Sequence, residues 1–263
     1  MDPTAAVKDA GNRKLPALIY IHGGGWVAGE KDVKHIYLSK FAEHGYFVVN
    51  IEYDLAPERI FPYAIGQCAA AADYFLDHAA DYPVNVEKIA VAGESAGVFY
   101  ACYVAAFAKD KTLLKKLGLN PMRNEGFDVK AVFSNCGGVD FKLLLDTHFP
   151  DIDLFLEAFS GCPYEELKAG KRDDLLETMN PMSHIRSDFP LTLLMYGSLD
   201  SLHTNTFSMQ KRFDEVKVPY TIYKCRGIFY GQHTTSFIFL FKKAYRILDD
   251  VLAWLDQTMR VVR

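Results

Sequence analysis

Two glycine-framed segments carry the clearest chemical signal in the sequence. Ser95 has a glycine at each second neighbour, in Gly93-Glu94-Ser95-Ala96-Gly97, and follows an apolar run over Lys88–Ala92. A strand that turns sharply into a helix strains the central residue and leaves no space for side chains beside it, so glycines are favoured there. Such a turn exposes a hydroxyl at the end of a strand. Ser95 is therefore a candidate nucleophile.

The other segment, His22-Gly23-Gly24-Gly25-Trp26, follows an apolar run over Pro16–Ile21. The backbone N–H groups of a glycine-rich loop can closely approach an oxygen atom on which negative charge develops. Together, the two segments indicate acyl transfer through a serine nucleophile.

A serine hydroxyl is a weak nucleophile that needs a base, and the base needs a carboxylate to orient it. Asp200 follows the apolar run Leu191–Tyr196 through a short turn, and His233 lies in the loop after the last apolar run. Because the carboxyl ends of parallel strands meet at one edge of a sheet, we expect Ser95, Asp200 and His233 to converge there. His203, close to Asp200 in sequence, is the alternative base.

The elements that must position these residues follow from hydrophobic patterning. Apolar runs typical of buried strands alternate with segments of helical periodicity. The runs are Pro16–Ile21, Tyr46–Glu52, Lys88–Ala92, Lys130–Asn135, Leu191–Tyr196 and Tyr220–Lys224, and the helical segments are Val33–Glu43, Tyr63–His78, Ala96–Lys109, Thr204–Val216 and Thr235–Leu255. Strands that are apolar on both faces indicate a parallel sheet covered by helices on both sides. The predicted fold class is α/β, a mostly parallel sheet of about six strands in a single domain over residues 1–263.

One interval, Phe141–His184, interrupts this alternation. It has no convincing strand but contains short helical patterns at Asp151–Phe159 and Tyr164–Lys168. An insertion of this length between two strands is usually functional or a subdomain. We expect residues 141–184 to form a small helical cap over the site. Four of its aromatic residues could line a pocket or simply pack within the cap: Phe149, Phe155, Phe159 and Tyr164.

Composition excludes several classes of function. A net charge of -4 over 263 residues, with no long run of like charges, gives no reason to expect nucleic acid. The odd, widely spaced set of five cysteines argues against a disulfide framework or a zinc site and favours a reducing compartment. Neither a signal-peptide pattern nor an apolar stretch of membrane-spanning length is found. We expect a cytoplasmic protein whose partner is a small molecule.

The joint order of several motifs is more specific than any one of them. The sequence resembles the hormone-sensitive-lipase-like group of α/β-hydrolases, also called the HGGG esterases. The matching segments span almost the whole chain: His22–Trp26, Tyr53–Glu58 followed by Phe61-Pro62, Gly93–Gly97, Asp200-Ser201-Leu202 and His233.

The resemblance implies a serine carboxylesterase that hydrolyses short-chain acyl esters through an acyl-serine intermediate, without metal or cofactor. Ser95 would be the nucleophile, His233 the general base and then the general acid, and Asp200 the group that orients the imidazole. The oxyanion hole would consist of the backbone N–H groups of Gly24, Gly25 and Ala96.

Two alternatives remain open at this point. An amidase or formamidase would use the same acyl-serine chemistry on a different leaving group. A non-catalytic ligand-binding protein is the other alternative, because the plant gibberellin receptor resembles the same group and has lost the triad histidine. The retention of His233 favours catalysis.

The sequence departs from the family pattern in several places. Asp54 stands where arginine is common, Glu94 where aspartate is common, and the family's aromatic residue two positions after His233 is absent. The family also has two strands and part of the cap before the first strand seen here. Without them, Tyr46–Glu52 would become a sheet edge with unpaired backbone groups. A homodimer formed through this edge, or an upstream segment, would cover those groups.

Overall fold

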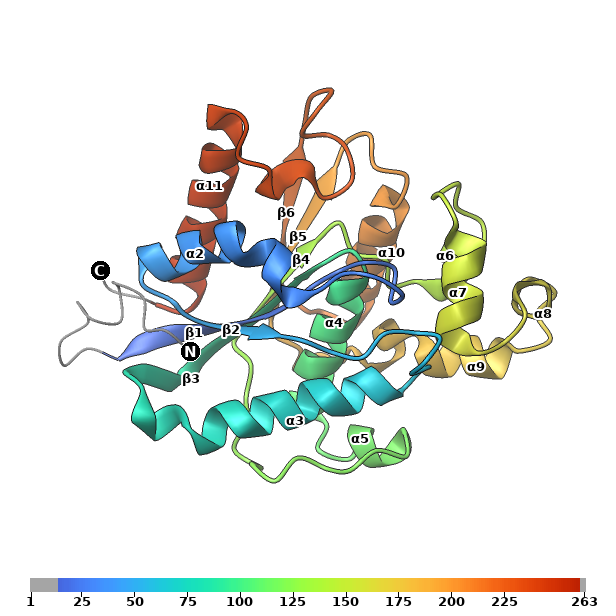
Figure 1. The fold of residues 1–263 in the computed structure, drawn as a ribbon, viewed down its shortest axis with the longest axis horizontal. Coiled ribbons are helices and arrows are strands. Elements are labelled where there is room, and N and C mark those ends of the chain that lie inside the picture. The colour runs from blue at the N-terminus through green and yellow to red at the C-terminus, as the bar shows by residue number, and fades with distance from the viewer. Residues whose placement is uncertain (1–13, 261–263) are drawn as a thin grey trace.

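The computed structural model describes residues 14–260. Its six strands form one sheet in the order β2-β1-β3-β4-β5-β6, and all five pairings are parallel (Figure 1). The strands are β1 Leu15–Ile21, β2 Phe47–Ile51, β3 Val84–Glu94, β4 Ala131–Asn135, β5 Leu191–Gly197 and β6 Tyr220–Cys225. The predicted α/β fold class, with a parallel sheet of six strands, is confirmed.

Helices cover both faces of the sheet because β1 alternates its apolar side chains between two cores. Ala17, Ile19 and Ile21 belong to a core that includes α3, α4 and α10. Leu18 and Tyr20 belong to a separate core that includes α2 and α11. The helices are α2 His35–His44, α3 Tyr63–Asp77, α4 Ala96–Lys109, α5 Leu113–Lys116, α10 His203–Val216 and α11 Lys242–Thr258. Figure 1 shows α2 and α11 together on one side of the sheet and α3 on the other.

The register of the sheet brings the two glycine-framed segments together. Ile21, the last residue of β1, lies opposite Gly93 near the end of β3. The loops that follow these two central strands therefore leave the sheet side by side. The helix after β3, α4, is buried from Ala96 to Ala108, which fixes its start beneath the loop after β1.

The segment between β4 and β5 is helical. It contains α6 Phe141–Leu144, α7 Ile152–Ser160, α8 Tyr164–Lys168, α9 Asp173–Met179 and a 3-10 helix, η3, over Pro181–His184. These helices lie to one side of the sheet, next to α4 and α10 (Figure 1). As the sequence predicts, no strand lies in this described interval. That residues 141–184 act as a cap over the site stays a prediction.

The predicted final helix, Thr235–Leu255, is wrong in its first part. A 3-10 turn, η4, covers Thr235–Phe237, and α11 begins only at Lys242. The reason is a tertiary contact, because the Tyr230 hydroxyl donates to the carbonyl of Ile238 at 2.9 Å and accepts from the N–H of Phe241 at 3.3 Å. These hydrogen bonds occupy the carbonyl of Ile238 and the N–H of Phe241, which a continuous helix would pair with its own backbone.

Strand β2 lies at one end of the sheet described here, as the resemblance implied for Tyr46–Glu52. One side of this strand pairs with β1, and no described strand pairs with the other. Two further 3-10 helices lie in the described chain: η1 Lys31–Lys34 and η2 Ala79–Asp81. Within residues 14–260, no helix has the length and apolar character needed to cross a bilayer.

Candidate active site

Ser95 stands at the sharp turn between β3 and α4. Its backbone has φ 52° and ψ −123°, a conformation that costs free energy for any residue other than glycine. A Cβ atom at Gly97 would lie 2.1 Å from the carbonyl oxygen of Ile21, and one at Gly93 would lie 2.4 Å from the carbonyl group of Gly97. The two glycines are thus required by the close approach of β1, β3 and α4. The turn is the one predicted for a nucleophile at the carboxyl end of a strand.

Ser95, His233 and Asp200 form a continuous chain of hydrogen bonds. His233 Nε2 lies 3.0 Å from Ser95 Oγ, and His233 Nδ1 lies 2.9 Å from Asp200 Oδ2. Because a carboxylate only accepts, Nδ1 carries the proton, and Nε2 is free to accept one from the serine. The structure therefore brings together the three side chains that the sequence predicted as a triad.

The His233 loop is held by its own hydrogen bonds. The Thr235 hydroxyl donates to the carbonyls of Phe229 at 2.8 Å and Gln232 at 3.3 Å. The other candidate base, His203, bonds the backbone carbonyl of Asp200 through Nδ1 and contacts Phe207 edge-on. His233 bonds the carboxylate instead, so the geometry favours His233 over His203.

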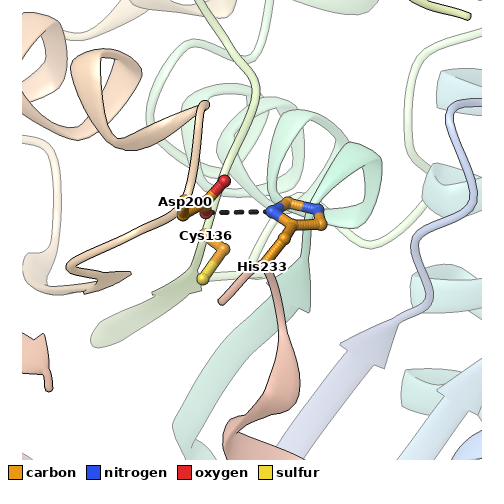
Figure 2. Close-up of side chains that lie close together, drawn as sticks. All are labelled: Cys136, Asp200 and His233. Carbon is orange, nitrogen blue, oxygen red and sulfur yellow. Dashed lines mark hydrogen bonds and ion pairs between the residues drawn. The ribbon is translucent and has the colours of Figure 1, made fainter. Parts of the chain in front are cut away.

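The thiol of Cys136 lies beside the Asp200–His233 pair (Figure 2). The sulfur, a carboxylate oxygen of Asp200 and a ring nitrogen of His233 all lie within 4.8 Å of one another, which is compatible with a metal site. However, burial and, to a smaller extent, the charge of Asp200 raise the pKa of the Cys136 thiol well above its usual value. A protonated thiol is a poor metal ligand, and the two other groups already bond each other. The cluster is better described as a hydrogen-bonded pair packed against an unreactive thiol.

The glycine loop, Gly23–Gly25, and the first residue of α4, Ala96, together offer three N–H groups without an acceptor among the described residues. Among the described residues, no acceptor takes the backbone N–H of Gly24, Gly25 or Ala96. Gly24 and Gly25 have positive φ angles of 128° and 60°, and a Cβ atom at Gly24 would lie 1.9 Å from the carbonyl oxygen of Ala28. The loop conformation therefore requires glycine, and it presents donors beside Ser95 that a ligand oxygen could use.

His22 anchors this loop from beneath. Its Nδ1 lies 2.8 Å from the carbonyl oxygen of Gly23, and its Nε2 lies 3.0 Å from Glu52 Oε1. The imidazole thus lies between two hydrogen-bond acceptors, one on the glycine loop and one at the end of β2. Partial burial opposes ionisation of Glu52, yet hydrogen bonds from the backbone of Lys31 and from His22 lower the pKa of its carboxyl. The ring also stacks on Tyr53 at 4.3 Å between centroids.

An open pocket of about 390 Å³ lies above these groups. Its lining includes the glycine loop, Ser95, His233, Val33 and Lys34, together with Phe149 and Phe155. Two of the four aromatic residues singled out in the sequence thus reach the pocket. The remaining two pack elsewhere, since Phe159 is buried against Trp26 and the Tyr164 hydroxyl donates to the carbonyl of Leu145.

The sequence missed one group that reaches this site. Lys34 Nζ lies 3.0 Å from Glu94 Oε1, the carboxylate that directly precedes Ser95. No local pattern marks Lys34, because the two residues are 60 positions apart and meet only when η1 packs against the end of β3. A cation that belongs to no sequence motif cannot be found from residue spacing alone.

Comparison with known proteins assigns the chain. The family designated BD-FAE matches residues 6–210, which is more than half of the sequence. The chain belongs to the BD-FAE family.

The solved structures similar to this BD-FAE member include esterase B from Lactobacillus rhamnosis, with a TM-score of 0.81 and 22% identity over 94% of this chain and 77% of that one. A bacterial heroin esterase has a TM-score of 0.73 and 24% identity over 93% and 75% of the two chains. The predicted α/β-hydrolase fold and the resemblance to the hormone-sensitive-lipase-like esterases are confirmed.

Curated relatives match a smaller part of this BD-FAE chain. The acetyl esterase of Salmonella paratyphi B is 40% identical over 95 residues, which is 36% of this chain. The acetyl esterases of Salmonella schwarzengrund and Salmonella agona match to the same extent. In each case the match spans 29% of the relative's own length.

Proposed function

We propose that this member of the BD-FAE family is a serine carboxylesterase that hydrolyses short-chain acyl esters through an acyl-serine intermediate. The observation that carries the proposal is the chain of hydrogen bonds from Ser95 through His233 to Asp200, set beside three N–H groups for which the described part of the chain provides no acceptor. Esterases among the similar proteins support the same reaction class.

Each residue has a distinct step. Ser95 Oγ attacks the carbonyl carbon of the ester while His233 Nε2 takes its proton. The negative charge that develops on the carbonyl oxygen is stabilised by the N–H groups of Gly24, Gly25 and Ala96. The tetrahedral intermediate collapses, and His233 returns the proton to the departing alcohol oxygen.

Water then hydrolyses the acyl-serine by the same steps in reverse roles. His233 takes a proton from water, the hydroxide attacks the acyl carbonyl, and the carboxylic acid leaves as the proton returns to Ser95 Oγ. Asp200 keeps the imidazole oriented and stabilises its charged form throughout. Two phenylalanines, Phe149 and Phe155, line the same pocket as Ser95 and offer apolar contact to a short acyl chain.

The test compares p-nitrophenyl acetate with p-nitrophenyl octanoate for the wild type and for Ser95→Ala, His233→Ala and the matched control His203→Ala. We expect faster turnover of the acetate, a loss of about 10³-fold or more in kcat for the first two variants, and little change for the control. A fluorophosphonate probe should label the wild type but not Ser95→Ala. No turnover and no labelling of the wild type would refute the esterase, and hydrolysis of p-nitroacetanilide in preference to esters would indicate an amidase.

We also propose that the open edge of β2 is covered in a homodimer. The support is the absence of a described strand on the outer side of β2, because an exposed edge invites pairing with another chain. Light scattering after size exclusion should give twice the chain mass of 29.7 kDa. A single-chain mass at all concentrations would contradict the dimer.

A cytoplasmic location is also part of the proposal. It is supported by the five cysteines, all of which are free and buried, as is usual in a reducing compartment.

A further inference from the structure

Glu94, the residue directly before Ser95, is a buried carboxylate with every oxygen engaged. Its exposed fraction is 2%. Oε1 accepts from the backbone N–H of Gly23 at 2.9 Å and lies 3.0 Å from Lys34 Nζ, while Oε2 accepts from the Tyr20 hydroxyl. Burial, and next the charge of Glu94, raise the pKa of Tyr20 well above its usual value, so Tyr20 remains a neutral donor.

Lys34 is the cation that faces this carboxylate. Its side chain is only 12% exposed, and its ammonium group lies 3.8 Å from the centroid of the Phe237 ring. A lysine held between a carboxylate and an aromatic face has little freedom to move. Lys34 and Glu94 both line the pocket that contains Ser95.

The hydrogen bond from Gly23 to Glu94 holds the start of the glycine loop in place. Gly23 is bound on both sides, since Glu94 accepts from its N–H and His22 donates to its carbonyl. The next two residues, Gly24 and Gly25, present the N–H groups assigned to the oxyanion. Fixing the peptide groups of Gly23 therefore fixes the direction in which those donors point.

The same carboxylate also creates an electrostatic problem. A buried negative charge next to the nucleophile repels the negative charge that develops on the substrate oxygen, and low local polarity strengthens the repulsion. A buried anion without a partner is also strongly unfavourable. Lys34 lies where a positive charge removes both effects.

On the basis of the proposed esterase reaction, we propose that Glu94 is a positioning residue for the glycine loop and that Lys34 is required to neutralise it. The two side chains then act as one unit. Removing Lys34 alone leaves an uncompensated anion beside the oxyanion, and removing the charge of Glu94 as well relieves that repulsion.

The test is a double-mutant cycle with Lys34→Met, Glu94→Gln and the double variant, measured as kcat and KM on p-nitrophenyl acetate. We expect Lys34→Met to lower kcat by about 10- to 100-fold with KM changed less than about threefold. If the two residues acted independently, the fold-losses in kcat of the two single variants would multiply. The kcat of the double variant should exceed that expected value by at least about tenfold. Multiplicative losses would overturn the proposal, as would a loss that appears in KM, because that would assign Lys34 to direct substrate binding.

Conservative variants separate charge from packing. Lys34→Arg keeps the cation and should retain most of the wild-type kcat, whereas Lys34→Gln should behave like Lys34→Met. Glu94→Asp keeps the charge but is shorter by one methylene, so it should lower kcat by loosening the hold on Gly23. Equal activity of Lys34→Arg and Lys34→Gln would contradict a role for the charge.

The matched control is Lys40→Met, which removes a surface lysine paired with Glu43 at 2.9 Å. It should leave kcat unchanged. Thermal unfolding and the rate of fluorophosphonate labelling report whether each variant is folded with an accessible Ser95. A wild type that shows neither turnover nor labelling refutes the proposed function itself. An active wild type whose two single-variant losses in kcat multiply in the double variant refutes only the coupling of Lys34 and Glu94.

Discussion

Each oxygen of the Asp200 carboxylate has its own donor. Oδ2 accepts from His233 Nδ1, and Oδ1 accepts from the backbone N–H of Leu202, both at 2.9 Å. The carboxylate is therefore fixed on one side by the main chain and presents one oxygen to the imidazole. This arrangement selects the tautomer in which Nε2 faces Ser95 without a proton.

Asp200→Asn should lower kcat by about 10⁴-fold with little effect on stability. The amide can keep the bond from Leu202, but it then presents its NH₂ group to Nδ1 and favours a ring with the proton on Nε2. Such a ring cannot take the proton of Ser95. Turnover of p-nitrophenyl acetate measures the loss, and Asp188→Asn, at an exposed ion pair with Arg186, is the control. A loss of less than about tenfold would contradict the orienting role.

The predictability of the site differs from residue to residue. Ser95, Asp200 and His233 could be predicted because each follows a recognisable strand, and the carboxyl ends of parallel strands meet at one edge. Lys34 and Tyr20 could not, because nothing near them in sequence indicates a buried carboxylate. Their roles depend on how η1 and β1 pack against the end of β3.

At the scale of elements, the crossing of β1 and α4 leaves no room for a side chain. Gly97, in the first turn of α4, is packed directly against the carbonyl groups of Ile21 and His22. The contact joins the strand before the glycine loop to the helix after the nucleophile. Any displacement of α4 therefore moves Ser95 relative to the loop.

Gly97→Ala should destabilise the protein by about 1–3 kcal/mol and lower kcat, because a Cβ atom 2.1 Å from the Ile21 oxygen forces α4 away from β1. Gly126→Ala is the control, since no atom lies within 4 Å of its added Cβ. Urea unfolding monitored by circular dichroism gives the free-energy change of each variant. Equal stability of the two variants would show that the backbone accommodates the methyl group.

Element boundaries were predictable where local pattern and tertiary packing agree. The predicted helices Ala96–Lys109 and Tyr164–Lys168 match α4 and α8. Strand β3 begins at Val84 rather than at the predicted Lys88, because its early residues pair with Leu15 and Pro16 across a register shift. That pairing brings polar residues into a strand whose apolar run begins later.

At the scale of the whole molecule, a buried carboxylate joins α3 to the chain that leads into β4. Asp73 accepts from the backbone N–H groups of Arg123 and Asn124, both at 2.9 Å, and from the Asn124 side chain. Burial alone would raise the pKa of Asp73, but these hydrogen bonds outweigh it and lower the pKa below its usual value. The carboxylate therefore stabilises the fold while it is ionised.

Asp73→Asn should cost about 1–3 kcal/mol at pH 7, because the amide NH₂ replaces an acceptor that faces N–H donors. A carboxyl whose pKa is lowered on folding contributes fully above its unfolded pKa of about 3.9 and loses that contribution as pH falls through the folded value. The difference between wild type and variant should thus shrink below about pH 4. Urea unfolding at pH 7 and pH 3 measures this difference in unfolding free energy, and Asp249→Asn, at an exposed position of α11, is the control. A difference that grows in acid would contradict a stabilising role for ionised Asp73.

The chain has two tryptophans, and they occupy opposite environments. Trp26 directly follows the glycine loop and is packed among Phe99, Phe141 and Phe159, with its Nε1 buried and unpaired within the described residues. Trp254 lies on α11 and donates to the Thr221 hydroxyl. In a Trp254→Phe background, Trp26 would be the only strong fluorophore. Its emission would then report movement of the adjoining glycine loop in real time, without a coloured substrate or an attached dye.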